Sequence, residues 1–321
     1  MEKFISCDWG TSAFRLRLVE ADTQNILAQI KTQQGIAATL AACKNEQDAD
    51  QFSFYLTILS DGIAMLEKQY GKTLTNIPLV VSGMASSSIG MLELPYKEAP
   101  FKADGSDLLV KNILQTLYFK HQILMISGVC SATDVMRGEE TILAGCPAAK
   151  EDGESIFIFP GTHSKHVIVS NGIALDFKTY MTGEIFDLLV NKSILAASLQ
   201  KAEGSYENEM DFYFNKGVLD GAAGNLLCNI FQVRVHQLFH HLDKKQNYHY
   251  LSGLLIGAEL KDIPLKKYAI VHLISSDELA QQYVKALHAT GITNVQYQQA
   301  DAALVYGQSV ICKQYYSTTK K

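Results

Sequence analysis

Residues 155–180 read SIFIFPGTHSKHVIVSNGIALDFKTY, and this stretch is the most informative part of the sequence about its fold. An apolar run at 155–159 leads into a turn at Gly161-Thr162, and residues 165–170 return from that turn as a second strand. Asn171-Gly172 is typical of a two-residue hairpin turn, so residues 173–180 are predicted to form a third strand. We therefore expect three consecutive strands joined by two tight turns.

The start of the chain repeats this pattern. Residues 4–19 read FISCDWGTSAFRLRLV, with Gly10-Thr11 at the turn, and residues 25–31 can supply the third strand. The two Gly-Thr turns lie about half the chain apart. The repeat predicts a duplicated domain, with one such turn in each half.

The remaining segments alternate between strand and helix patterns, which indicates an α/β architecture. Continuous apolar runs, typical of strands buried on both faces, occupy 78–81 and 123–126. Further strands are predicted at 269–274 and 295–298. Helices are predicted at 49–70, 183–199, 217–242 (one or two helices), 250–260, 277–288 with Ser/Asp caps, and 301–313 with Asp301 as N-cap.

Composition excludes several classes of protein. The chain has 321 residues, 47% of them apolar and 19% charged, which fits two compact domains and argues against disorder. A net charge of −5 gives no broad basic surface for nucleic acid or an anionic membrane. No 18-residue apolar run and no signal-peptide stretch occurs, so a cytoplasmic protein is expected.

Cysteine and histidine give no metal signature. The six cysteines are scattered without a CxxC pair, which favours reduced and mostly buried thiols. His236 and His240 are four residues apart and could hold a metal if 224–242 is helical. No carboxylate or cysteine partner is evident nearby, so an ordinary helix face is the prediction.

The first candidate site is the turn Asp8-Trp9-Gly10-Thr11-Ser12. Glycine in a tight turn lets backbone N–H groups approach an anion, and the two hydroxyls add donors. Asp8 would repel a bare phosphate, so its position makes sense when Mg²⁺ and its waters lie between them. A plain hairpin turn rich in Asp, Gly and Ser is the alternative.

The second copy of the turn, Gly161-Thr162 with His163 and Lys165, strengthens this interpretation. Two anion-binding turns facing each other across a cleft could clamp a polyphosphate. Pro160 stands where the first copy has Asp8, so only the N-terminal half offers a carboxylate to a metal.

The next candidate is Arg137-Gly138-Glu139-Glu140-Thr141, which opens a predicted helix. Carboxylates in a first helical turn stabilise the helix through its dipole, and this is the simpler explanation. The functional explanation is a general base that takes a proton from an attacking hydroxyl, with Arg137 holding an anionic group.

Two further segments are less specific. Residues 82–88 (SGMASSS) follow a buried strand, where small hydroxyl side chains suit a sugar. Residues 252–259 (SGLLIGAE) have Gly253 and Gly257 four apart in a helical pattern. These glycines allow tight helix packing, which is the favoured use, or let a flat ring lie against the backbone.

Together, these segments resemble the 2-dehydro-3-deoxygalactonokinase family of the sugar kinase and actin superfamily. The resemblance spans residues 8–259, and its motifs are DWGTS (8–12), MRGEET (136–141), PGTHSK (160–165), MTGE (181–184) and SGLLIGAE (252–259). It implies two ribonuclease-H-like α/β domains around a nucleotide cleft. We place the first at 1–128, the second at 129–300, and a terminal helix at 301–321 that packs back on the first.

The resemblance also implies an activity: ATP-dependent phosphorylation of 2-dehydro-3-deoxy-D-galactonate at its 6-hydroxyl, in galactonate breakdown. ATP and Mg²⁺ are the implied cofactors, and a small sugar acid is the partner rather than nucleic acid or membrane. A homodimer is compatible with the sequence. A kinase of the same fold acting on another keto-sugar acid or sugar remains an alternative. Two further alternatives are a catalytically silent sugar-binding regulator and an ATP or polyphosphate hydrolase.

Family roles are carried over residue by residue. The implied catalytic base is Glu139, with the adjacent Glu140 left open, and Asp8 is the implied magnesium residue. Phosphates are assigned to Gly10, Thr11, Ser12, Arg15, Gly161, Thr162, His163 and Lys165. Adenosine is assigned to Gly253 and Gly257, and the sugar acid to Gly83, Met84, Ala85 and Arg137.

The sequence departs from the family pattern at two places. Ser275-Ser276-Asp277 stands where related kinases carry glycine beside the adenine, which leaves nucleotide preference open. Met91 stands where an aromatic residue is expected, which leaves open the preferred epimer of the sugar acid.

Overall fold

The computed structural model describes residues 2–47, 50–201, 208–264, 268 and 270–319. The chain forms two compact units. Unit 1 comprises Met1–Gly153, Val169–Phe177 and Ala300–Lys321, and unit 2 comprises Glu154–Ile168 and Lys178–Gln299. Residues 129–153 thus lie in unit 1, whereas the sequence placed a boundary after residue 128. The C-terminal helix also belongs to unit 1.

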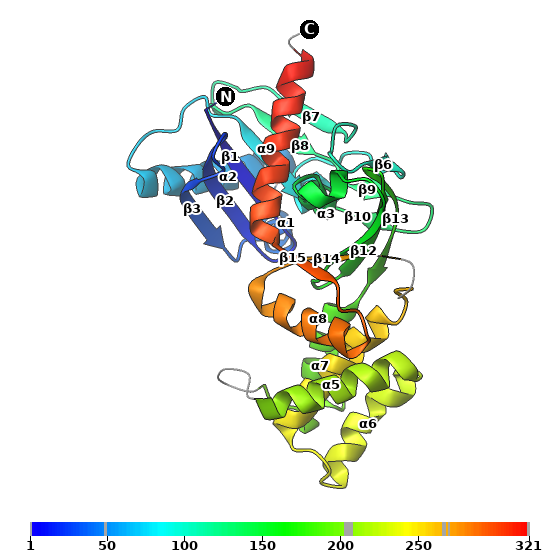
Figure 1. The fold of residues 1–321 in the computed structure, drawn as a ribbon. Helices are drawn as coiled ribbons and strands as arrows, with labels where there is room; N and C mark the ends of the chain where they lie inside the picture. The colour runs from blue at the N-terminus through cyan, green and yellow to red at the C-terminus, as the bar shows by residue number, and fades with distance from the viewer. Residues whose placement is uncertain (1, 48–49, 202–207, 265–267, 269, 320–321) are drawn as a thin grey trace. The chain divides into compact units, whose positions relative to one another are not determined.

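A six-stranded sheet with the order β3-β2-β1-β4-β8-β7 forms the centre of unit 1 (Figure 1). Its strands are β1 (Lys3–Trp9), β2 (Phe14–Glu20), β3 (Ile26–Thr32), β4 (Leu79–Gly83), β7 (Val110–Ile113) and β8 (Ile123–Ile126). Strand β2 is antiparallel to both β1 and β3, whereas β4 pairs parallel with β1 and β8 pairs parallel with β4. The strands expected from the opening pattern and from both apolar runs are therefore confirmed.

Helices α1 (Ile36–Asn45) and α2 (Gln51–Tyr70) follow β3. The apolar face of α2 buries Tyr55, Leu59 and Leu66 in a core shared with Trp9 and Phe14. The Asp50 side chain caps the start of α2 by accepting from the Ser53 amide. This cap and the apolar period of 49–70 explain why the helix forms where it was predicted.

Smaller elements complete unit 1. They are η1 (Met84–Ser86), β5 (Lys97–Glu98), β6 (Phe101–Lys102), β9 (Val129–Cys130), β10 (Val135–Met136), α3 (Glu139–Ala144), η2 (Pro147–Lys150) and α9 (Ala300–Thr319). Strands β10, β9 and β5 form a separate sheet, and β6 pairs antiparallel with Ile173 and Ala174. Figure 1 shows α9, in red, beside α3, and α9 also contacts β1 and β4.

The second large sheet repeats the strand order of the first. Its strands β11 (Glu154–Phe159), β12 (Ser164–Ser170), β13 (Ile173–Tyr180), β14 (Val271–Ser275) and β15 (Val295–Gln299) have the order β15-β14-β11-β12-β13. This order matches β8-β4-β1-β2-β3, with β14 parallel to both β11 and β15. The shared order confirms two ribonuclease-H-like sheets. Asn171 and Gly172 have φ of 50° and 75°, as the predicted hairpin turn requires.

Helices make up the rest of unit 2. They are α4 (Thr182–Lys192), η3 (Ala196–Ser198), α5 (Asn208–Ala223), α6 (Leu226–Leu238), α7 (Lys244–Leu260) and α8 (Asp277–Ala289). The region 217–242 thus holds the end of α5 and the whole of α6. One apolar core joins α5, α7 and α8 to β11 and β14, and a second joins α4, α6 and α7.

Three local expectations turn out differently. Asp301 was expected to be the N-cap of the last helix, but α9 already includes Ala300, and Asp301 instead pairs with Arg17 at 2.8 Å. Ser276 occupies the N-cap position of α8, but its side chain makes no capping hydrogen bond. Helix α6 ends at Leu238, so His240, with φ of 56°, lies beyond it.

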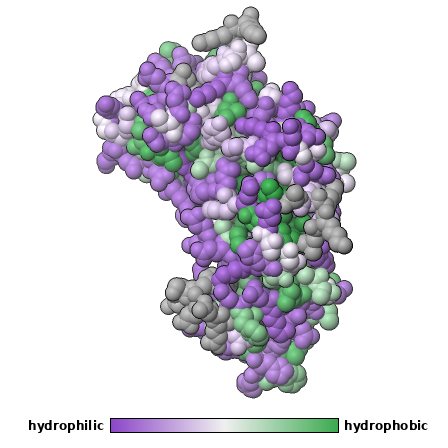
Figure 2. Space-filling model, in the orientation of Figure 1, coloured by the Kyte–Doolittle hydropathy of each residue, from purple (hydrophilic) through white to green (hydrophobic). Residues whose placement is uncertain are grey.

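Most of the cysteines are buried, and the visible surface is mainly polar. All six cysteines are free, and Cys7, Cys43, Cys146 and Cys312 are buried, as the scattered spacing predicted. Among the described residues, no helix is both long and apolar enough to cross a bilayer. Figure 2 shows that polar residues dominate the visible face, with apolar residues in smaller patches.

Candidate functional site

The first Gly-Thr turn connects β1 to β2 in unit 1. The Gly10 amide donates to the Ala13 carbonyl at 2.9 Å, which closes the turn, and Thr11 and Ser12 are exposed. A Cβ atom on Gly10 would meet only one atom within 4 Å, the Ala13 oxygen at 3.7 Å. Protein packing does not demand glycine here, whereas close approach of a ligand to the backbone would.

The start of α1 supports this turn from behind. The amides of Ile36 and Ala37 donate to the carbonyls of Gly10 and Thr11 at 2.9 and 3.1 Å. A Cβ atom on Gly35 would lie 2.4 Å from the Thr11 oxygen, so only glycine allows this contact. Sequence reasoning missed Gly35. The available signal was a glycine between the third strand and the next helix.

Asp8 and Arg15 form an ion pair across β1 and β2. The Arg15 Nη1 atom lies 2.6 Å from Asp8 Oδ2, and the two side chains are 31% and 18% exposed. The strands pair these residues directly, which explains their meeting. Asp8 and Arg15, predicted separately for metal and phosphate, are thus brought together.

Two glycines bring the end of β4 and the start of α3 to Asp8. Gly83 has φ of 88°, and its Cβ atom would lie 2.9 Å from the Trp9 oxygen and 3.6 Å from Asp8 Oδ1. Gly138 has φ of 115°, and its Cβ atom would lie 3.5 Å from the Gly83 Cα atom. Both positions require a residue that tolerates positive φ. The segments predicted to contact the sugar acid, to hold magnesium and to supply the base therefore meet within unit 1.

The two neighbouring glutamates at this point have different surroundings. Glu140 is 1% exposed and accepts from the Gly138 amide at 2.7 Å and the Thr141 hydroxyl at 2.8 Å. Burial, and secondly the charge of Glu139, raise the pKa of Glu140 to about 7. Glu139 is half-buried and accepts from the Arg137 amide at 3.2 Å. Only Glu139 retains surface that a substrate could touch.

Arg137 lies in a defined position beside this cluster. Its Nη1 atom donates to the Ser86 carbonyl at 2.6 Å and to the Ser86 hydroxyl at 2.7 Å. Its guanidinium carbon lies 4.2 Å from the centre of the Tyr96 ring, within cation–π range. The structure thus orients this half-buried cation near η1.

The other residues predicted to contact the sugar acid are less accessible. Met84 is half-buried and packs against the core of unit 1. Ala85 is fully buried in that core, so its side chain has a packing role. Met91 is 3% exposed and belongs to the same core.

A residue of α9 holds the ends of β1 and β4. The fully buried Gln308 donates from Nε2 to the Cys7 carbonyl at 2.9 Å and to the Ser82 hydroxyl at 2.8 Å. These partners immediately precede Asp8 and Gly83. Sequence reasoning missed Gln308, because nothing local in the sequence connects it to residues 301 and 226 positions earlier.

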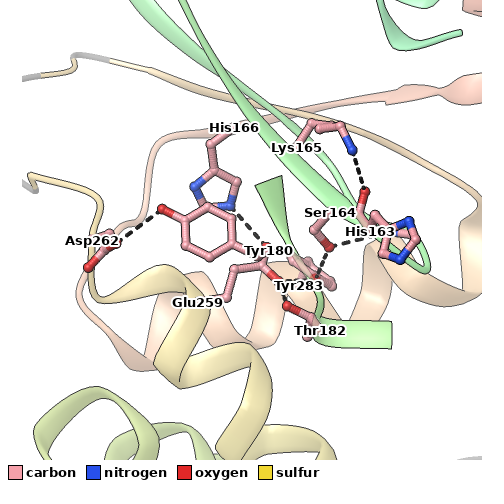
Figure 3. A network of polar contacts seen from close by, with 10 residues as sticks. His163, Ser164, Lys165, His166, Tyr180, Thr182, Glu259, Asp262 and Tyr283 are labelled. Atoms are coloured by element: carbon pink, nitrogen blue, oxygen red, sulfur yellow. Dashed lines mark hydrogen bonds and ion pairs between the residues drawn. The ribbon is translucent and has the colours of Figure 1, made fainter. Parts of the chain in front are cut away.

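The second Gly-Thr turn belongs to unit 2 and connects β11 to β12. Nothing lies within 4 Å of a Cβ atom built on Gly161, and Thr162 and His163 are exposed. His163 contacts Glu184 through Nε2. Lys165 is only 5% exposed, and its ammonium donates to the His163 carbonyl at 3.4 Å (Figure 3). Lys165 therefore supports the turn from within.

The start of α4 supports the second turn as α1 supports the first. The Glu184 amide donates to the Thr162 carbonyl at 3.0 Å, as the Ala37 amide does to Thr11. A Cβ atom on Gly183 would lie 2.6 Å from the Gly161 oxygen. Each turn thus rests on a glycine at the start of the helix after its third strand, and the duplication extends to this detail.

Gly253 and Gly257 lie where α7 packs on α5. Their Cβ atoms would lie 2.0 Å from the Phe214 oxygen and 2.1 Å from the Val218 oxygen. Both glycines are buried, so helix packing, the use favoured from sequence, accounts for them. Their contact with an adenosine stays a prediction. Ser275, at the end of β14, is 1% exposed.

Asp8 is the acidic side chain beside the first Gly-Thr turn. Among the described residues, no group of three or more His, Cys, Asp and Glu side chains could hold a metal ion. Asp8 is a single carboxylate beside an open turn. This fits Mg²⁺, which is often bound by one carboxylate, waters and the phosphates of a nucleotide, better than a metal caged by protein alone.

Comparison with known proteins gives a consistent result. Residues 8–311 match the family described as 2-keto-3-deoxy-galactonokinase. The chain is 29% identical to the 2-dehydro-3-deoxygalactonokinase of Escherichia coli (strain K12) over 90% of both proteins. It also matches a crystal structure from Sinorhizobium meliloti that is assigned to the 2-dehydro-3-deoxygalactonokinases. That match has a TM-score of 0.81 at 29% identity, covering 97% of this chain and 96% of the other.

Proposed function

The chain belongs to the 2-keto-3-deoxy-galactonokinase family, and on this premise we propose that it transfers the γ-phosphoryl group of ATP to the 6-hydroxyl of 2-dehydro-3-deoxy-D-galactonate. The protein is an ATP-dependent carbohydrate kinase. One observation carries the assignment of roles: Asp8, Gly83 and Gly138 adjoin one another in unit 1, with Glu139 directly after Gly138. This reaction belongs in the cytoplasm, where ATP is available.

Glu139 is the proposed general base. Its carboxylate accepts the proton of the 6-hydroxyl as that oxygen attacks the γ-phosphorus of ATP. A bond then forms between the sugar oxygen and the γ-phosphorus, the bond to the oxygen bridging the β- and γ-phosphates breaks, and ADP leaves. Glu140 is buried and accepts hydrogen bonds from the Gly138 amide and the Thr141 hydroxyl, so its proposed role is to stabilise the first turn of α3.

The two Gly-Thr turns are the proposed phosphate-binding segments. The open space over Gly10 and Gly161 lets phosphate oxygens approach the backbone, and the Thr11 and Ser12 hydroxyls add donors. That both turns bind the same triphosphate stays a prediction. Magnesium arriving with ATP neutralises phosphate charge, and Asp8 is the residue that would hold it.

Arg137 is the proposed anchor of the substrate carboxylate. Its guanidinium is oriented by Ser86 and by the Tyr96 ring, so little side-chain freedom remains to be lost on binding. It lies one residue before Gly138, which brings a positive charge close to the proposed base.

The test is coupled ADP release with 2-dehydro-3-deoxy-D-galactonate and, in parallel, with its gluconate epimer. We expect turnover with the first to exceed turnover with the second, and Glu139→Gln to lower kcat about 100-fold or more. Glu140→Gln is the matched control and is expected to retain most activity. Near-normal turnover by Glu139→Gln would remove Glu139 from the role of base, and equal or better turnover of another acceptor would reassign the substrate.

A further inference from the structure

Glu259 lies near the end of α7, where other polar side chains surround its carboxylate (Figure 3), and it is only 3% exposed. His166 Nε2 on β12 lies 2.9 Å from its Oε1 atom. The Tyr283 hydroxyl on α8 donates to Oε2 at 2.8 Å, and the Thr182 hydroxyl at the start of α4 donates to the same atom. Burying a carboxylate is costly unless donors surround it, and here three separate elements supply them.

The first connection from Glu259 to the second Gly-Thr turn runs through Tyr283. The Tyr283 and Ser164 hydroxyl oxygens are 2.9 Å apart, and the Ser164 oxygen accepts from the Gly161 amide at 3.4 Å. A carboxylate only accepts, so Tyr283 donates to it. Ser164 must then donate to Tyr283. The chain of hydrogen bonds therefore has one direction, from the Gly161 amide to Glu259.

The second connection runs through Thr182. This residue starts α4, and the next two residues contact the turn: Gly183 packs on the Gly161 carbonyl, and the Glu184 amide donates to Thr162. By holding the Thr182 hydroxyl, Glu259 fixes the helix start on which the turn rests. Both sides of the turn thus depend on one buried carboxylate.

We infer that Glu259 is a positioning residue for nucleotide binding, acting on the turn at 161–163 through Tyr283 and Thr182. The inference rests on the proposed function, because it takes this turn to be a phosphate-binding segment. Glu259 does not touch the nucleotide in this account. Its substitution should therefore weaken binding of ATP far more than binding of the sugar acid.

The experiment measures the Kd of a non-hydrolysable ATP analogue by calorimetry, together with KM for ATP and for the sugar acid. Glu259→Gln keeps the volume of the side chain and removes one acceptor. We expect it to raise the Kd and KM for the nucleotide about tenfold and leave KM for the sugar acid within about twofold. Tyr283→Phe should raise the nucleotide Kd less than Glu259→Gln does. In a variant that already carries Glu259→Gln it should raise the Kd little further, because both residues act through the same chain of hydrogen bonds.

Two further variants serve as references: one changes the turn directly, and the other changes a buried side chain outside the network. Gly161→Ala places a methyl group in the open space over the turn and is expected to weaken nucleotide binding directly. Asn247→Ala, on the same helix, removes a fully buried amide that donates to the Val233 carbonyl at 3.1 Å, outside this network. It should lower the melting temperature while leaving the nucleotide Kd unchanged.

The outcomes separate a positioning role from a merely structural one. An unchanged nucleotide Kd in both Glu259→Gln and Tyr283→Phe would overturn the inference. The inference would also be overturned if Glu259→Gln raised KM for ATP and KM for the sugar acid equally, and if Asn247→Ala raised both to the same extent. If the wild-type protein binds the nucleotide without phosphorylating the sugar acid, the proposed substrate fails and the comparison of Kd values still tests Glu259. Absence of nucleotide binding by the wild-type protein would end both proposals.

Discussion

Glu139 and Glu140 are neighbours in the chain, and the helix directs them to different surroundings. Successive side chains on a helix point about 100° apart, so one of two adjacent residues can face the interior while the other faces solvent. Glu140 is 1% exposed and held by Gly138 and Thr141, whereas Glu139 is half-buried. At this scale, burial rather than residue type separates a structural carboxylate from a candidate base.

The raised pKa of Glu140 predicts a pH-dependent stability. Its pKa rises from 4.5 to about 7 in the folded state, so folding favours the protonated form. The favourable contribution is fully present below pH 4.5 and is lost as the pH rises through about 7. We expect Glu140→Gln, which cannot ionise, to gain roughly 2 kcal/mol in free energy of unfolding relative to wild type between pH 5 and pH 8.

The fluorescence of Trp9 can be used to measure the free energy of unfolding of unit 1. This residue is the only tryptophan in the sequence and is fully buried in unit 1, so its fluorescence during urea unfolding reports on this unit. Glu93→Gln, which removes an exposed carboxylate elsewhere in unit 1, is the control for the loss of a surface charge. A pH-independent difference between Glu140→Gln and wild type would contradict the raised pKa.

At the scale of elements, the short helix α3 depends on α9. A Cβ atom on Gly145 would lie 1.8 Å from the Ala303 oxygen, and one on Gly307 would lie 1.9 Å from the Thr141 oxygen. The two helices therefore touch backbone to backbone. Six residues are too few for a helix to be stable alone, so this contact places Glu139.

Gly307→Ala tests this dependence. The added methyl group must push α3 away from α9, which we expect to cost about 1–3 kcal/mol in free energy of unfolding. Because α3 carries Glu139, kcat should fall about tenfold or more at temperatures where the variant is fully folded. Ser317→Ala, at the exposed end of the same helix, is the control for a substitution in α9 away from α3, and it should leave kcat unchanged. Normal kcat in a destabilised Gly307→Ala would show that the position of α3 does not limit the reaction.

At the scale of the whole molecule, the units are interleaved in sequence. The chain passes between them after residues 153, 168, 177 and 299, so unit 1 is assembled from three segments. The last of these, α9, buries Leu304, Val305 and Ile311 and supplies Gln308 to the ends of β1 and β4. Unit 1 should therefore not fold without the C-terminal helix.

A chain ending at residue 299 provides the test. We expect it to lose cooperative unfolding of unit 1, seen as a red-shifted Trp9 emission without denaturant, because the apolar surface that α9 covers becomes exposed. Adding residues 300–321 back as a separate peptide should restore part of the signal. A native Trp9 spectrum and full turnover in the shortened chain would show that α9 is dispensable.

Much of the fold followed from local patterns. The apolar run at 123–126 became β8, the Asn171-Gly172 hairpin turn formed as predicted, and the two Gly-Thr stretches became turns between matching strands. Patterns failed where a longer-range contact competed with a local preference. Asp301 has the chemistry of an N-cap and instead pairs with Arg17.

Short-range sterics and the spacing of buried residues along a strand or helix are properties of neighbouring residues, so the strands, the turns and the motifs of this kinase could be predicted before the fold was known. The roles of Gly35, Gly183, Gln308 and Glu259 became visible only in the folded chain. Each of them acts on a partner from a different element, and such a contact exists only after the chain has brought the two elements together.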